Sequence, residues 1–240
     1  MHEPRPVPSV AQFQLLAWCS PAYPTGAFSY SHGLEYAVEC GTVTTLDALL
    51  EFITAVLERG GGWVDAVLFA HAWRAGHLAQ PDWEAGGRAR LREIAELAAA
   101  FRASAETALE SRQQGRAFLD VTLKAWPHPR LARFASDVSG LPVAQCVAVA
   151  VAFAAHGLEL TMALPAFLQM TAANLVSAGA RLIPLGQTDA QIAVARLAPV
   201  VGATAARALG TDLADLGTAA PLLELYSMHH ETQYTRLFRS

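Results

Sequence analysis

Apolar residues recur at the spacing of one helix face along most of the chain, and this periodicity limits the possible folds more than any other feature. The clearest run follows two threonines suited to cap a helix and consists of Leu46, Leu49, Leu50, Ile53, Val56 and Leu57. About a fifth of the positions are alanine, the strongest helix former. No segment alternates with period two, and no Asn-Gly or Asp-Gly hairpin signal occurs. The sequence therefore predicts an all-α fold.

The chain has 240 residues, a length that favours one domain and allows two. We expect a single-domain bundle of about nine or ten helices over residues 1–240, with a mobile N-terminal segment at residues 1–8. Pro165 is a possible kink, and an interruption is expected near Pro199 or Gly202. The expected helices are 10–17, 46–57, 64–75, 88–103, 104–124, 129–138, 143–155, 158–183, 187–209 and 221–230, with a short helix or turn at 211–217.

The composition excludes several classes of protein. Hydrophobic residues make up 53% of the chain and charged residues 16%, which argues against general disorder. The net charge of −4 argues against a nucleic-acid binder. The apolar run 143–155 is too short to span a bilayer, and polar residues interrupt the longer stretch 158–184. No signal-peptide pattern opens the chain, so we expect a cytoplasmic protein without a membrane partner.

Motifs that would indicate an enzyme are absent from the sequence. The single lysine, Lys124, is followed by alanine, which excludes a P-loop, and no Gly-rich dinucleotide motif or nucleophile elbow occurs. The three cysteines form no CxxC pair. Two pairs of glutamates have the i, i+4 spacing that is typical of ordinary polar helix faces: Glu35 with Glu39, and Glu106 with Glu110. We expect no catalytic residue and no cofactor.

Two neighbouring histidines, His229 and His230, are the only metal candidates worth naming. Adjacent residues on a helix point about 100° apart, so they do not face one ligand together. They are interpreted as polar or hydrogen-bonding residues, with a transient metal contact as the alternative.

Three segments are more polar and more patterned than plain scaffold. Residues 20–35 carry two prolines and the aromatic residues Tyr23, Phe28 and Tyr30, which favours an interaction loop over a structural one. Residues 174–191 place Arg181 before a Pro-Leu-Gly break, consistent with a contact site or an exposed arginine at a helix junction. Residues 227–240 mix aromatic residues with arginines, which favours a docking tail over a frayed end.

Together these segments resemble the UreF family of urease accessory proteins. The resemblance lies in Ser20-Pro21-x-x-Pro24-x-Gly26-Ala27-Phe28-Ser29-Tyr30-Ser31-x-Gly33-Leu34-Glu35, Leu182-Ile183-Pro184-Leu185-Gly186-Gln187-Thr188 and His230-Glu231-x-Gln233-Tyr234-x-Arg236-Leu237-Phe238-Arg239-Ser240, with Glu110-x-Arg112-Gln113 and Gly115 as a weaker fourth match. The matches keep the family order over nearly the whole chain. One position departs from the pattern: His229 stands where the family usually has arginine.

The resemblance implies a non-catalytic chaperone for nickel insertion into apo-urease. Proteins of this kind form homodimers, bind the UreD/UreH accessory protein and recruit the GTPase UreG. The alternative is a GTPase activator or regulator, with Arg181 as an arginine finger supplied to UreG. The residues expected to contact partners are Tyr23, Phe28, Tyr30, Glu35, Arg181, Gln187, Tyr234, Arg236, Leu237, Phe238 and Arg239. We expect the tail, residues 226–240, to be mobile alone and to order on UreD/UreH.

Overall fold

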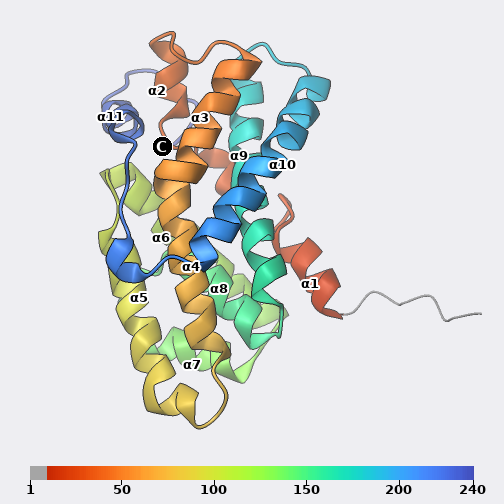
Figure 1. Cartoon of the computed structure of the whole chain (residues 1–240). Helices are drawn as coiled ribbons and strands as arrows, with labels where there is room; N and C mark the ends of the chain where they lie inside the picture. Colours follow the sequence, from red (N-terminus) through yellow and green to blue (C-terminus); the bar gives the residue numbers. More distant parts are fainter. Residues whose placement is uncertain (1–9) are drawn as a thin grey trace, which may run out of the picture.

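The computed structural model describes residues 10–240, and every regular element in this range is helical (Figure 1). The α-helices are α1 Val10–Trp18, α2 Leu34–Glu39, α3 Leu46–Arg59, α4 Gly61–His77, α5 Arg88–Ala100, α6 Ala105–Ala125, α7 Pro129–Asp137, α8 Gln145–Ala155, α9 Leu160–Leu182, α10 Gln187–Leu209 and α11 Pro221–His230. Short turns of other helix types are η1 Ala27–Ser29, η2 Trp83–Gly87 and η3 Leu213–Asp215. The predicted all-α fold is confirmed. The expected mobile segment 1–8 lies outside the described residues.

Helix α3 shows how the sequence signals act locally. The hydroxyl of Thr45 accepts a hydrogen bond from the backbone N–H of Ala48 at 3.2 Å and so caps the first turn. Leu49, Ile53 and Leu57 follow on one face and are fully buried. The cap and the apolar stripe therefore specify the same helix start and the same buried face.

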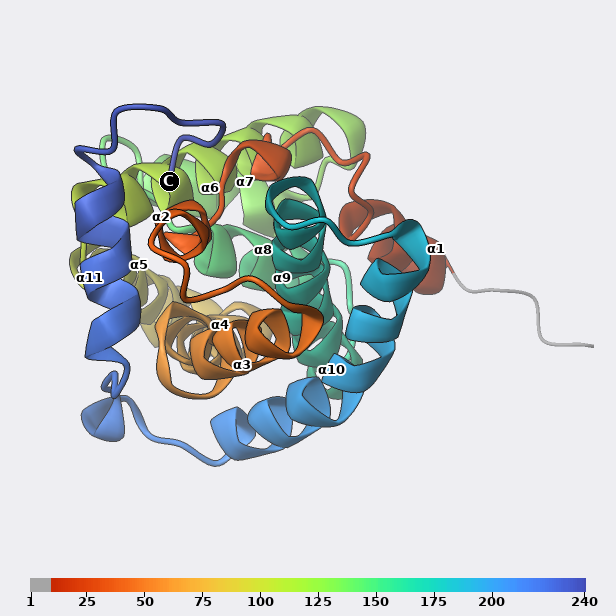
Figure 2. The same ribbon diagram turned by 90° about the horizontal axis from the view of Figure 1, so that it is seen from above.

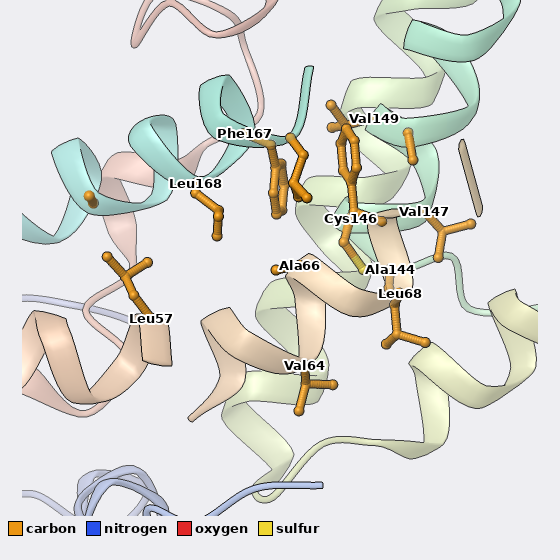
Figure 3. Packing of buried hydrophobic residues seen from close by; sticks show 14 of the residues in the cluster. Leu57, Val64, Ala66, Leu68, Ala144, Cys146, Val147, Val149, Phe167 and Leu168 are labelled. Carbon is orange, nitrogen blue, oxygen red and sulfur yellow. The ribbon is translucent and has the colours of Figure 1, made fainter. Parts of the chain in front are cut away.

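Helices α4 and α8 form the centre of the bundle. Every residue from Cys146 to Ala154 is buried, so α8 has no solvent-facing side. A short helix that is apolar all round is stable only when neighbours cover it, and α8 packs against α4, α6, α7 and α9. Figure 3 shows Cys146 and Val149 of α8 and Phe167 of α9 within this core.

Two long helices continue through prolines. Helix α9 contains Pro165, and α10 contains Pro199, so the interruption expected near Pro199 or Gly202 is wrong. A proline frees the carbonyl four residues earlier, which here belongs to Ala195. Both Ala195 and Pro199 are exposed, so water can satisfy that carbonyl without breaking the helix.

Helices α9 and α10 are also long and apolar enough, by length and composition, to cross a membrane. Core helices of soluble proteins meet the same test, and α9 contacts α2, α3, α4, α8 and α10 within the bundle. Packing in the bundle covers part of the apolar surface of the two helices, while Met162 of α9 and Ile192 of α10 are exposed.

Helix α2 begins at Leu34, at the end of the segment 20–35, and packs against α11 (Figure 2). Gly33, immediately before α2, has a φ of 78°, and a Cβ there would lie 2.7 Å from the backbone nitrogen of Ser227. Only glycine allows this approach. This close approach brings the start of α2, the last turns of α11 and residues 231–240 to one end of the bundle.

Candidate functional site

The last residues of the chain pair with the segment that precedes α2. The backbone N–H of Arg239 donates to the carbonyl of Ser29 at 2.8 Å, and the N–H of Ser31 donates to the carbonyl of Ser240 at 2.7 Å. Figure 2 shows the end of the chain lying beside α2 and α6. The C-terminal segment, residues 231–240, is therefore part of the packed body in this structure.

Glu35, in the first turn of α2, is the main acceptor for this segment. One carboxylate oxygen accepts the backbone N–H of Leu237 at 2.6 Å. The other accepts the N–H of Phe238 at 2.9 Å and faces Nε2 of His230 at 2.9 Å. Glu35 is only 7% exposed. A buried carboxylate that accepts two backbone N–H groups is stabilised by charge-assisted hydrogen bonds, so it fixes the backbone of the segment.

His230 bridges two helices through both of its ring nitrogens. Nε2 faces Glu35, and Nδ1 lies 2.6 Å from Glu106 at the start of α6. Both contacts are hydrogen bonds only if both nitrogens carry hydrogen or one carboxyl is protonated. The second oxygen of Glu106 accepts from the guanidinium of Arg236 at 2.7 Å, which closes the cluster toward solvent.

Glu110, one turn further along α6, holds the end of the segment. Its carboxylate accepts from the hydroxyl of Ser240 at 2.7 Å and from the amide of Gln114 at 2.8 Å. Nε2 of His32 lies 3.0 Å from the same carboxylate. Burial alone lowers the pKa of His32, but the charge of Glu110 and the hydrogen bond to it outweigh burial and raise that pKa above its ordinary value.

Arg181 connects the end of α9 to the same segment. Its guanidinium lies over the ring of Phe238, 4.3 Å from the ring centre, in a cation–π contact. Its Nε donates to the carbonyl of Ser177 at 3.2 Å. Partial burial lowers the pKa of Arg181 from its ordinary value. All three patterned segments of the sequence, together with the fourth match on α6, therefore meet at this end of the bundle.

Large apolar side chains are exposed around this cluster. Tyr234 and Leu237 of the C-terminal segment are 103% and 65% exposed, and Phe28 of η1 is 69% exposed. Helix α11 adds three residues at i, i+3 and i+6 spacing, each between 44% and 54% exposed: Leu222, Leu225 and Met228. These six residues are called the tail-end surface below. Exposed aromatic and aliphatic residues on elements that adjoin one another are typical of protein-binding sites.

No group of three or more histidine, cysteine or acidic side chains within residues 10–240 has the arrangement of a metal site. His230 is fully buried between its two carboxylates, and His229 stacks on the ring of Tyr36 at 5.1 Å. Both histidines therefore have structural partners.

Known proteins of one family match this chain. The profile of the UreF family covers residues 43–198. The urease accessory protein UreF of Rhodopseudomonas palustris (strain TIE-1) is 50% identical over 232 residues, which is 97% of this chain and 93% of the relative. UreF of Granulibacter bethesdensis is 50% identical over 232 residues, 96% of this chain and 94% of the relative. This chain belongs to the UreF family.

Membership confirms the resemblance drawn from the motifs and places the chain among proteins of urease maturation. The relatives are named accessory proteins. The family profile covers neither residues 20–35 nor the C-terminal segment, whereas the alignments with the two relatives cover nearly the whole chain.

The structure separates the expected contact residues into exposed and enclosed ones. Exposed residues are Phe28, Arg181, Gln187, Tyr234, Arg236, Leu237 and Arg239. Tyr30, Glu35 and Phe238 are buried in the protein, and their expected contact with a partner stays a prediction. Tyr30 donates its hydroxyl to Gln113, and the half-buried Tyr23 bonds the hydroxyl of Thr122 at 2.7 Å.

The expectation of a mobile tail over residues 226–240 also differs from the structure. Residues 226–230 complete α11, where Tyr226 and His230 are buried. Residues 231–240 are short of apolar area, but buried carboxylates on α2 and α6 hold them. The sequence did contain a signal for these acceptors: Glu106 and Glu110 at i, i+4 spacing, interpreted there as an ordinary polar face.

Proposed function

We propose that this chain is a non-catalytic scaffold in urease maturation and that its tail-end surface binds a UreD/UreH-like accessory protein. The observation that carries the proposal is the way the C-terminal segment is held. Three buried carboxylates, Glu35, Glu106 and Glu110, fix its backbone and polar groups, while Tyr234 and Leu237 remain exposed. A segment fixed in this way presents its side chains without a further ordering cost on binding.

The surface has the composition of a binding site. Its apolar residues come from η1, α11 and the C-terminal segment, and the exposed Arg236 and Arg239 lie beside them. Apolar anchors with arginines at the edge are typical of the central and outer parts of protein interfaces. We therefore assign Leu225, Tyr234 and Leu237 as the main anchors.

A pull-down with the UreD/UreH-like partner tests this assignment. The double variant Tyr234→Ser/Leu237→Ser is expected to reduce capture at least tenfold and to keep the melting temperature of the wild type, because both side chains are exposed. The matched control is Met162→Ser/Ile192→Ser, which removes exposed apolar residues from α9 and α10. Normal capture by the tail-end variant would contradict the assignment.

Recruitment of the GTPase UreG belongs to the same proposal, with apo-urease reached through the complex. Arg181 and Gln187 lie exposed at the junction of α9 and α10. We assign this junction to UreG, next to the tail-end surface. Capture of UreG by the preformed complex should fall for Gln187→Ala, which leaves the contact between Arg181 and Phe238 in place. Unchanged capture would remove Gln187 from the interface.

The alternative function is activation of GTP hydrolysis by Arg181 as an arginine finger, and it requires the Arg181 side chain to move. Its guanidinium would have to leave the ring of Phe238 to reach a nucleotide. GTP turnover by UreG distinguishes the two functions. A finger raises turnover by orders of magnitude and Arg181→Ala abolishes the increase, whereas a scaffold has no such effect.

Self-association completes the proposal. Helix α1 exposes a second apolar stripe, Val10, Phe13 and Leu16, which are 61–73% exposed. We assign this stripe to a homodimer contact. Light scattering should give a dimer for the wild type and a monomer for Phe13→Ser/Leu16→Ser. A variant that stays dimeric would place the contact elsewhere.

A further inference from the structure

A groove runs along the outer side of α6, apart from the tail-end surface. Its volume is about 700 Å³, and α6 forms one wall while α7 and the loop from Val138 to Val143 form the other. Gly115 allows the walls to meet at the floor, since a Cβ there would lie 2.1 Å from the carbonyl of Val143. The groove is thus built into the packing of α6 against residues 143–145.

The floor of the groove is apolar and its α6 rim is cationic. Leu119, Val138 and Val143 are buried below it. Arg112 and Arg116 stand on the rim, and both are exposed. Arg116 pairs with Asp120 at 2.8 Å, at a position open to solvent. Among residues 10–240, no hydrogen bond or ion pair engages the side chain of Arg112.

The cationic character continues beyond the groove. The guanidinium of Arg239 donates to Gln113, a groove residue, at 3.4 Å. Arg112 and Arg239 thus add two exposed positive charges that no acidic side chain in the described range neutralises, on a chain whose net charge is −4. A local positive site on an acidic protein attracts an acidic ligand in preference to other surfaces.

The spacing of the rim arginines selects an extended chain. Residues four apart on a helix are separated by about 6 Å along its axis. Residues i and i+2 of an extended peptide are about 6.6–6.8 Å apart on the same side. Two acidic residues in an acidic–apolar–acidic pattern therefore match Arg112 and Arg116, while the intervening apolar side chain faces the opposite wall at Leu141 and Pro142.

We propose that this groove binds an extended segment of a partner protein with alternating acidic and apolar residues. The carboxylates pair with Arg112 and Arg116, and the apolar residue covers the α7–α8 side. The groove and the tail-end surface have no residue in common, and Arg239 lies beside both.

Fluorescence anisotropy tests it with a labelled peptide, Gly-Gly-Glu-Val-Glu-Val-Glu-Gly-Gly, on the full chain at low salt. Saturable binding is expected, weakened about fivefold or more in Arg112→Gln/Arg116→Gln. The matched control Arg90→Gln/Arg196→Gln removes the same charge from α5 and α10 and should bind within twofold of the wild type. A peptide with glutamine in place of glutamate should bind as weakly as the groove variant does to the acidic peptide.

A second variant tests the shape of the groove without changing its charge. Ala117→Tyr fills the groove from α6 and is expected to weaken binding by a similar factor. Three results would each overturn the proposal: no saturable binding, equal binding of the two peptides, or equal losses in the groove and control variants. If Ala117→Tyr does not fold, the arginine variants still decide the matter.

Discussion

Replacing Glu35 by glutamine is expected to release the C-terminal segment while the helical bundle stays folded. The two carboxylate oxygens accept the N–H groups of Leu237 and Phe238 and face His230. Glutamine offers one oxygen, and its amide nitrogen turns a donor toward a donor. At least one buried N–H group therefore loses its acceptor.

The size of the effect follows from these contacts. A hydrogen bond to a charged group contributes about 1.5–3 kcal/mol, and a buried donor left without a partner costs about 1–3 kcal/mol. Docking of the segment should weaken by roughly 2–4 kcal/mol, which is about a 30- to 1000-fold shift toward the released state. Helix α2 itself stays anchored because Leu34 and Ala37 are fully buried in the core.

Hydrogen exchange followed by mass spectrometry measures this shift. Residues 231–240 should exchange much faster in Glu35→Gln than in the wild type, while α8 keeps its protection. Glu51→Gln, at an exposed position on α3, is the matched control and should change neither region. Wild-type protection of residues 231–240 in Glu35→Gln, or equal loss of protection in α8, would refute the reasoning.

Three further perturbations follow from the same structure. Gly115→Ala should lower the melting temperature by several degrees, because its Cβ meets a backbone carbonyl at 2.1 Å; an unchanged melt would contradict that packing. The pKa of His32 is raised above 6.5 by Glu110, so the stabilising contribution of His32 is complete below pH 6.5 and is lost as pH rises through the raised pKa. In denaturant titrations, the free energy of unfolding of the wild type should exceed that of His32→Asn by less at pH 9 than at pH 6. An equal difference at both pH values would contradict the raised pKa. Arg181→Ala should weaken docking of the C-terminal segment by about 1 kcal/mol, measured as faster exchange at Phe238, and unaltered exchange would exclude the cation–π contact.

The helices could be predicted where local signals agreed. The Thr45 cap and the apolar stripe after it identify α3, and the strongly apolar run 143–155 identifies α8. Helix α10 was misjudged at Pro199, because a sequence does not show that the freed carbonyl will face solvent. Propensity describes a residue, whereas the cost of a proline depends on its surroundings.

The site was predictable as a set of segments and not as a set of contacts. Sequence patterns marked residues 20–35, the end of α9 and the C-terminal residues, all of which meet in space. They did not show that Glu35 would accept hydrogen bonds from residues about 200 positions away. An isolated segment with little apolar area is expected to be mobile, and only a non-local buried carboxylate changes that expectation.

A footprint of the UreD/UreH-like partner on this chain tests the proposed scaffold function most directly. Hydrogen exchange of the full-length chain, free and in complex, reports which backbone segments the partner covers. New protection is expected in α11, in residues 231–240 and around Phe28, with α5 and α7 unchanged. Protection confined to other helices, with these segments exchanging as in the free protein, would contradict the assignment of the tail-end surface.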